Sequence, residues 1–127
     1  MNRKNTWILV GGISGFLGVA IGAFGAHGLS DILTSQMMGI YKTGVDYQLI
    51  HSVVILAIGL AGDGRFLTAA FFFALGIILF SFSLYAYSLT GITAIAIVTP
   101  FGGVSFLVGW MIVILRAFQK NSDSDRN

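Results

Sequence analysis

The 127-residue sequence contains no cysteine and no glutamate, and it has a single proline. The absence of cysteine excludes disulfides, thiolate metal sites and cysteine nucleophiles. Charge is also scarce: charged residues make up 9% of the chain, against roughly 25% in a soluble domain. A soluble fold would therefore lack the charges to cover its surface. Nucleophilic hydrolysis has no support either, because neither histidine lies in a recognisable Ser/His/Asp setting.

What the chain has instead is apolar sequence: 56% of its residues are hydrophobic, and its mean hydropathy is +0.88. The apolar residues form four stretches, at about residues 7–29, 43–61, 66–89 and 94–118. The first and third carry no charge, and at 1.5 Å per residue they reach ~34 Å, enough to cross a bilayer core of ~30 Å. The sequence therefore predicts an all-α, polytopic membrane protein, a bundle of four transmembrane helices in a single domain over residues 1–127.

The segment 30–42 separates the first two stretches and is more polar. Its apolar residues, with Leu29 before them, recur at roughly helical spacing: Leu29, Ile32, Leu33, Met37, Ile40 and Tyr41. This pattern predicts a short amphipathic helix lying in the membrane interface. Residues 62–65 predict a tight turn, and residues 120–127 form a polar tail.

The cations predict the orientation in the membrane. Four spans place both termini and the 62–65 turn on one side, which holds six of the seven Lys and Arg residues: Arg3, Lys4, Arg65, Arg116, Lys120 and Arg126. Lys42 is alone on the other side. Because cations favour the cytoplasmic side, we expect both termini in the cytoplasm of a bacterial plasma (inner) membrane. A basic terminus beside an apolar span indicates topology or contact with anionic lipid, so no nucleic-acid partner is expected.

Glycines form a stripe along the first stretch, at steps of four, three, four and three residues: Gly11, Gly15, Gly18, Gly22 and Gly25. Lipid tails are as apolar as leucine, so membrane helices associate where small residues let their backbones approach. The stripe therefore predicts a helix contact. Packing within the chain is favoured, and a homo-oligomer interface is the alternative. Weaker stripes follow on the third and fourth stretches: Ala69, Gly76, Ser83, Gly102, Ser105 and Gly109.

Ionisable groups within the spans are the default functional candidates, because they cost ~2.5–3.5 kcal/mol at a helix centre. Both histidines are expected in the outer leaflet, where they could face each other beside other polar groups. The candidate polar site comprises His27, Asp31, Asp46, Tyr47, Gln48 and His51. A hydrogen-bonded clasp is the favoured interpretation. Haem ligation, a divalent-metal or proton-coupled site, and a quinone pocket are the alternatives. No metal ligand and no cofactor is assigned.

The segment around the single proline, Thr99, Pro100, Gly102 and Gly103, has two interpretations. Thr99 and Pro100 could be the N-cap and first residue of the last helix. Pro100 could instead kink one longer helix by removing a backbone hydrogen bond. Transporters use broken helices as binding sites, but a simple kink or start is favoured.

Several motifs together resemble a known family: Gly22–Leu29, Thr43–His51, Ser83–Tyr85, Leu89–Gly91, Thr99–Gly103 and Gly109–Trp110. The chain resembles the domain of unknown function 423 family, with YgdD-like and YwdK-like bacterial members, over nearly its whole length. The resemblance implies a four-helix inner-membrane protein without an assigned activity or catalytic residues to transfer. It includes His27, Tyr47, His51, Tyr85, Pro100 and Trp110 in the family pattern, whereas Asp46 and Gly28 depart from it.

These observations predict a non-enzymatic accessory or scaffold subunit that acts through helix packing. Its expected partners are the lipid bilayer and either a second copy of the chain or a membrane complex. The alternative is a small transporter or cofactor-binding protein (haem, metal or quinone) that uses His27 and His51.

Overall fold

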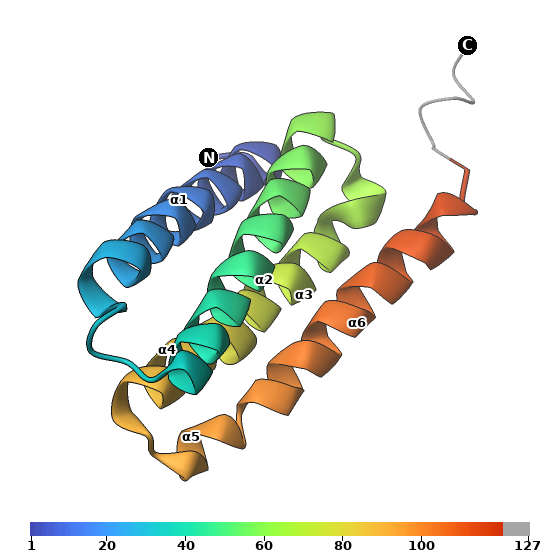
Figure 1. The fold of residues 1–127 in the computed structure, drawn as a ribbon. Helices are drawn as coiled ribbons and strands as arrows, with labels where there is room; N and C mark the ends of the chain where they lie inside the picture. Colours follow the sequence, from blue (N-terminus) through green and yellow to red (C-terminus); the bar gives the residue numbers. More distant parts are fainter. Residues whose placement is uncertain (121–127) are drawn as a thin grey trace.

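The structure is a computed structural model, and it describes residues 1–120. These residues form four long helical segments that run alternately up and down (Figure 1). The first comprises α1 (Arg3–Phe24) and the π-helical turn η1 (Gly25–Leu29), and the second is α2 (Ser35–Ala61). The third comprises η2 (Gly64–Phe66), α3 (Leu67–Gly76), the π-helical turn η3 (Ile77–Ser81) and α4 (Phe82–Thr90). The fourth comprises α5 (Thr93–Ala96) and α6 (Thr99–Ala117).

Each segment is long and apolar enough to cross a membrane, with 25 to 27 residues. At 1.5 Å per residue this is about 38–40 Å, more than the ~30 Å hydrocarbon core. The four segments are Arg3–Leu29, Ser35–Ala61, Gly64–Thr90 and Thr93–Ala117. The predicted all-α, four-span architecture is confirmed.

Local sequence explains where the helices begin and end. The side-chain oxygens of Asn2 and Thr34 accept hydrogen bonds from the backbone N–H groups of Asn5 (2.9 Å) and Met37 (3.2 Å), which caps α1 and α2. Gly62 and Gly91 follow α2 and α4 with φ of 68° and 70°. This left-handed conformation favours glycine and ends both helices in tight turns.

The prediction of a separate interfacial helix over residues 30–42 is wrong. Helix α2 is continuous from Ser35 to Ala61, so residues 35–42 form its first turns, and only residues 30–34 connect it to η1. The reason is Tyr41, which is 3% exposed and packs against Gly25. Its hydroxyl donates a hydrogen bond to the Ile21 carbonyl at 2.5 Å. The apolar face of this segment therefore packs on α1 instead of on the membrane surface.

The glycine stripe of α1 faces α2 of the same chain. A Cβ added to Gly11 would lie 2.7 Å from the backbone nitrogen of Leu56, and one added to Gly18 would lie 2.7 Å from Leu49 Cδ2. The remaining glycines of the stripe meet Ser52, Val45 and Tyr41 in turn. Because these contacts occupy the stripe, a homo-oligomer would have to use another surface.

Helices α3 and α6 interlock through two phenylalanines and two glycines. The Phe73 ring lies against Gly109, and the Phe106 ring lies against Gly76. Gly102 packs on the backbone at Phe80, where only a hydrogen side chain fits. These contacts surround the larger buried cluster of the bundle, which comprises Ile55, Ala69, Phe73, Ile77 and Phe106.

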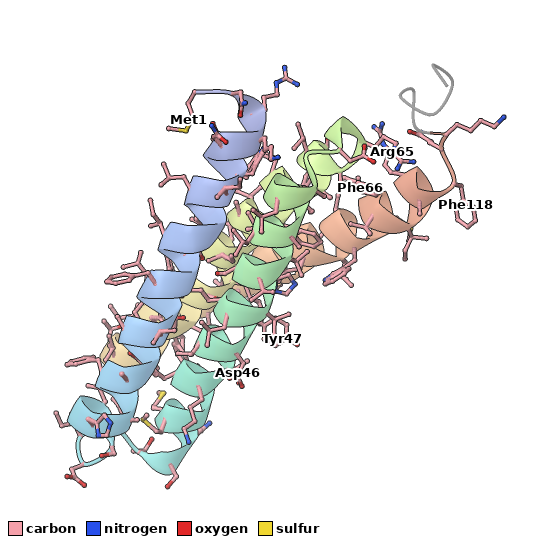
Figure 2. All side chains as sticks on the ribbon, turned by 90° about the horizontal axis from the view of Figure 1, so that it is seen from above. Met1, Asp46, Tyr47, Arg65, Phe66 and Phe118 are labelled. Atoms are coloured by element: carbon pink, nitrogen blue, oxygen red, sulfur yellow. The ribbon has the colours of Figure 1, made fainter. Side chains whose placement is uncertain are left out.

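The N-terminus, the α2–α3 turn and the end of α6 lie at one end of the bundle, as the labels of Met1, Arg65 and Phe118 show (Figure 2). This arrangement brings together the cations that were expected to share a side. Arg126 and the predicted polar tail beyond Lys120 lie outside the described residues.

Candidate functional site

His51 lies on the second span and is 4% exposed. Its Nδ1 lies 2.7 Å from the Tyr47 carbonyl, and its Nε2 lies 3.1 Å from Trp110 Nε1. An indole nitrogen is only a donor, so Nε2 must accept its hydrogen. Nδ1 then carries the proton and donates it to the Tyr47 carbonyl. Both nitrogens are engaged in a single neutral tautomer, which leaves no lone pair for haem iron or another metal.

Aromatic rings from three helices surround this imidazole. It stacks on Phe106 at a centroid distance of 3.8 Å and an interplanar angle of 11°. Phe73 lies 5.4 Å away, Tyr47 lies 6.0 Å away, and Trp110 meets the imidazole edge-on at 5.9 Å. We call Tyr47, His51, Phe73, Phe106 and Trp110 the His51 cluster. The cluster joins α2 to α3 and α6 through apolar surface and one hydrogen-bonded ring.

A cavity of about 500 Å³ borders the His51 cluster between α2 and α6. Its walls include Phe80 and residues of the first turns of α6, namely Pro100, Gly103, Val104 and Leu107. The cavity opens outward between side chains that are themselves exposed, with Val104 57% and Leu107 69% exposed. Its size falls within the ~300–1,000 Å³ typical of ligand sites, but its lining is aromatic and aliphatic. Its polar side chains are those of Tyr47 and His51, and both nitrogens of His51 are already engaged, so the cavity is best suited to an apolar group.

A second polar group, centred on Gln48, lies on the side of α2 that faces α1 and α4. The Gln48 side chain is fully buried; its Nε2 donates to the Ser14 carbonyl at 2.9 Å, and its Oε1 accepts from the Tyr85 hydroxyl at 2.6 Å. The hydroxyls of Ser52 and Ser14 lie 2.6 Å apart, and Ser52 also donates to the Gln48 carbonyl at 2.5 Å. These bonds link α1, α2 and α4. Separating the helices would leave polar groups unsatisfied in hydrocarbon, at a cost of several kcal/mol.

The structure does not bring His27 and His51 together. His27 is exposed on η1, whereas Ser52, next to His51, lies beside Ser14. His27 is thirteen residues beyond Ser14 in the same segment, about 20 Å further along the bundle. The expectation of comparable depth is therefore wrong, because the second helix begins earlier than predicted and pairs with α1 in a different register.

The other predicted polar residues separate as well. Asp31 is exposed in the connection before α2, and Asp46 is exposed beside Lys42 at a cavity of about 320 Å³. Tyr47 belongs to the His51 cluster, whereas the Gln48 side chain faces the neighbouring interface with α1 and α4. Within residues 1–120, no group of three or more His, Asp or Glu side chains is arranged to hold a metal ion.

Pro100 lies in the first turn of α6, so it starts this helix and does not kink it. Thr99 is not the N-cap as predicted, because the cap position falls on Val98. The Thr99 hydroxyl lies instead 2.7 Å from the Ser83 hydroxyl on α4. A polar contact to the neighbouring span has replaced the local cap. Gly102 serves the contact with Phe80, and Gly103 lines the cavity beside His51.

Sequence reasoning missed Trp110 and Ser14 as partners of the buried polar residues. Trp110 carried a usable signal, because tryptophan in membrane proteins favours the two interfaces, and Trp110 lies seven residues, about two helical turns, inside the end of the last span. A tryptophan at that depth needs a partner for its N–H group. Ser14 carried no such signal, since small residues are common on any packed membrane helix.

A charged turn lies at the end of the bundle that holds the start of α1 and the end of α6. Arg65 binds the Asp63 carboxylate through Nε at 3.0 Å and Nη2 at 2.6 Å, and it also donates to the Gln119 carbonyl after α6. The hydrogen bonds from Arg65 hold the pKa of Asp63 below its ordinary value. The turn between α2 and α3 is thereby connected to the end of the last helix.

The chain is similar in sequence to a family of membrane proteins. The family model described as "Protein of unknown function (DUF423)" matches residues 21–103. The chain is 43% identical to the UPF0382 inner membrane protein YgdD of Escherichia coli (strain K12), over 88% of each chain. It is 39% identical to the UPF0382 membrane protein YwdK of Bacillus subtilis (strain 168), over 87% of this chain and 94% of the relative. It is also 38% identical to a UPF0382 membrane protein of Haemophilus influenzae, over 94% and 98%. No solved structure matches the chain.

Proposed function

The chain belongs to the DUF423 family of membrane proteins, whose description assigns no activity, and on this premise we propose that it is a non-enzymatic accessory or scaffold subunit of the inner membrane. It presents a rigid, preformed surface to a transmembrane helix of a partner protein.

The observation that carries the proposal is that the side chains of His51 and Gln48, the two largest buried polar residues, are fully hydrogen-bonded; the hydroxyl of buried Ser81 has no partner within residues 1–120. Both nitrogens of His51 are engaged, and the amide of Gln48 is bonded at both its oxygen and its nitrogen. A transporter needs polar groups that exchange partners along a pathway. A catalytic residue likewise needs a free donor or acceptor facing its substrate. The His51 imidazole and the Gln48 amide use their donors and acceptors on other groups of the protein, which supports a structural role for both.

The partner surface that we propose is the outward face of α6 with the neighbouring cavity. This helix covers the bundle on one side and presents a row of exposed apolar side chains, comprising Phe101, Val104, Leu107, Met111, Ile114 and Leu115. The cavity beside His51 interrupts this surface and has room for a large side chain from a facing helix. Ridges that enter such grooves determine how membrane and soluble helices pack.

We further propose that both termini lie in the cytoplasm. The described cations support this orientation. The start of α1, the α2–α3 turn and the end of α6 share one end of the bundle, and these segments carry five of the cations: Arg3, Lys4, Arg65, Arg116 and Lys120. Lys42 lies near the start of α2. Alkaline phosphatase fused after Lys120 should be inactive, because this enzyme folds only outside the cytoplasm. An active fusion would contradict the orientation.

Site-specific crosslinking in native membranes tests the proposed subunit role. A photoreactive residue at Leu107, in the α6 face, is compared with one at Phe16, which is 74% exposed on α1. We expect a discrete protein adduct from position 107 and only lipid adducts from position 16. The mass of the adduct separates a second copy of the 13.6 kDa chain from a different protein. Lipid adducts alone at both positions would contradict the proposal.

A further inference from the structure

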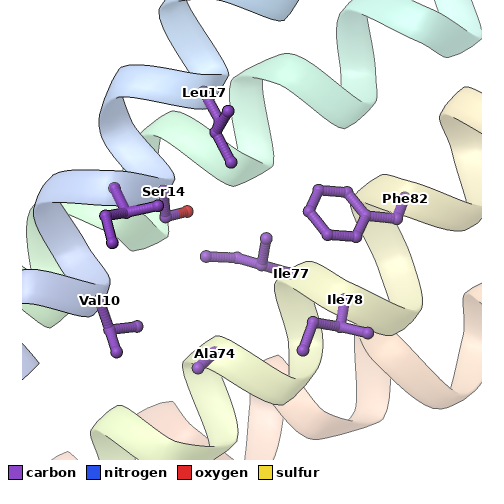
Figure 3. Close-up of a pocket in the computed structure, with 8 residues that line it drawn as sticks. Val10, Ser14, Leu17, Ala74, Ile77, Ile78 and Phe82 are labelled. Atoms are coloured by element: carbon purple, nitrogen blue, oxygen red, sulfur yellow. The ribbon is translucent and has the colours of Figure 1, made fainter.

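Two cavities lie one after the other along the groove between α1 and the third span. The first, of about 460 Å³, lies at the end that holds the termini and is lined by Arg3, Trp7, Leu67, Thr68 and Phe71. The second, of about 260 Å³, lies further along the same helices, and Figure 3 shows its walls on α1 and the third span. Its walls are mostly aliphatic and include Val10, Ile13, Leu17, Ile77, Ile78 and Phe82.

The two cavities follow the same faces of the two helices. On α1, Trp7, Val10 and Leu17 are separated by three and seven residues; on the third span, Phe71 and Ile78 are separated by seven. Residues at these spacings lie above one another on one face of a helix. From Arg3 to Leu17 the groove extends for fourteen residues, about 21 Å, whereas one leaflet of a ~30 Å core is about 15 Å deep. The groove is therefore long enough for a headgroup and a chain that reaches the bilayer centre.

The first cavity has hydrogen-bond donors that are suited to a phosphate. Arg3 is exposed and makes no ion pair with any residue in the described range 1–120. The Trp7 indole and the Thr68 hydroxyl have no hydrogen-bond partner within that range either. A guanidinium binds phosphate oxygens through two parallel hydrogen bonds, and tryptophan favours the depth of lipid headgroups.

The surrounding charge selects an anion. Lys4, Arg65 and Arg116 lie on the segments at the same end of the bundle, and Asp63 there is engaged by Arg65. Each Lys or Arg near an anionic membrane surface contributes about 1 kcal/mol of attraction. A zwitterionic headgroup carries a positive group that would add to the cations of the protein in this region, so a headgroup with a net negative charge fits better.

The second cavity offers hydrocarbon contacts and little else. Its one hydroxyl, that of Ser14, is already close to Ser52 at 2.6 Å. We propose that this groove binds one anionic phospholipid, with its phosphate at Arg3, Trp7 and Thr68 and one acyl chain between α1 and the third span. The site lies on helices other than α6, so it is independent of the partner surface proposed above.

Native mass spectrometry of the full chain released from detergent micelles tests the site. The protein is titrated with phosphatidylglycerol and with phosphatidylcholine of identical acyl chains, and inorganic phosphate is the third probe. We expect one phosphatidylglycerol per chain, bound at least about tenfold more tightly than phosphatidylcholine, and no displacement by millimolar phosphate. Equal binding of both lipids, or full displacement by free phosphate, would overturn the proposal.

Two variants separate this groove from general attraction to positive charge. Arg3→Gln should weaken phosphatidylglycerol binding about five- to tenfold, whereas Arg116→Gln, which removes a cation of the same end outside the groove, should leave it within twofold. Arg3 is exposed and near the terminus, so its replacement leaves the fold intact. An equal loss in both variants would contradict a specific site. Thr68→Val, a second substitution in the groove, should also reduce phosphatidylglycerol binding, and unchanged binding would contradict the proposed phosphate contact.

Discussion

Trp110 on α6 donates its indole N–H to Nε2 of His51 on α2 across 3.1 Å. The bond joins the last span to the second across 59 positions of sequence. It also holds His51 in one neutral tautomer, because Nδ1 donates to the Tyr47 carbonyl. A histidine that sequence reasoning nominates as a ligand is therefore part of the interface between helices.

Replacement of Trp110 by phenylalanine tests this bond. The substitution keeps an aromatic ring and removes the donor to Nε2 of His51. Hydrogen bonds between membrane helices contribute about 0.6 kcal/mol on average and up to about 1.7 kcal/mol, so we expect a loss of unfolding free energy in that range. Steric trapping in bicelles measures it. The double variant with His51→Phe should lose less than the sum of the two single variants, and strict additivity would contradict the bond.

The bond between Tyr85 and Gln48 predicts a second effect. Tyr85→Phe removes the hydroxyl that donates to Gln48 Oε1 at 2.6 Å and leaves this buried oxygen without a donor. An unsatisfied buried acceptor costs about 1–3 kcal/mol. Tyr87→Phe is the matched control, because the Tyr87 hydroxyl has no hydrogen-bond partner within residues 1–120. Unfolding in mixed micelles should separate the two variants, and equal stability would contradict the role of the Gln48 group.

Adjacent glycines on α1 provide the sharpest test of the helix packing. A Cβ at Gly11 would lie 2.7 Å from the Leu56 backbone nitrogen, whereas a Cβ at Gly12 meets nothing within 4 Å. Gly11→Ala should therefore cost about 1–3 kcal/mol, the usual cost of overpacking. Gly12→Ala should be neutral or stabilising, because alanine is the better helix former. Stabilities in the reverse order would show that α1 and α2 pack through another face.

The sequence predicts the spans and the packing faces because both are repetitive signals. Hydrocarbon requires about 20 consecutive apolar residues, and the spacing of Gly11, Gly18 and Gly25 defines one face of a helix. The partners of His51 and Gln48 are different. These two residues are three apart on α2 and lie within about 60° of each other around the helix, yet one reaches Trp110 and the other Ser14 and Tyr85. Their partners depend on where α1, α4 and α6 lie, which local spacing does not encode.

The irregular segments were also beyond prediction, for physical reasons. The π-helical turn Ile77–Ser81 inserts one residue into the third span, and such turns have no dependable sequence signature. The apolar spacing of residues 30–42 fits a helix on the membrane surface as well as a buried one, so the sequence predicts a longer connection than the five residues 30–34 of the structure. Only the position of Tyr41 against α1 distinguishes the two.

The charged turn predicts a dependence on pH. The pKa of Asp63 is lowered from 3.8 by its hydrogen bonds with Arg65, so the folded state favours the ionised carboxylate. The stabilisation is present above the ordinary pKa and is lost as the pH falls through the lower pKa of the folded state. Asp63→Asn should therefore lower the Tm slightly at pH 7, and the difference from wild type should vanish in strong acid. The effect is small and weakens with salt, because the side chains of Asp63 and Arg65 are partly accessible to solvent. A Tm difference that is constant down to pH 2 would contradict it.

Crosslinking in living cells determines whether this bundle is in stable contact with another membrane component, as the proposed subunit role requires. The chain is tagged at its chromosomal locus, crosslinked in living cells and solubilised in mild detergent, and the mass of the recovered species is determined. We expect a species of defined mass above 13.6 kDa, with a second protein or a second copy in fixed ratio. Recovery of the monomer alone, with lipid as its sole adduct, would contradict it.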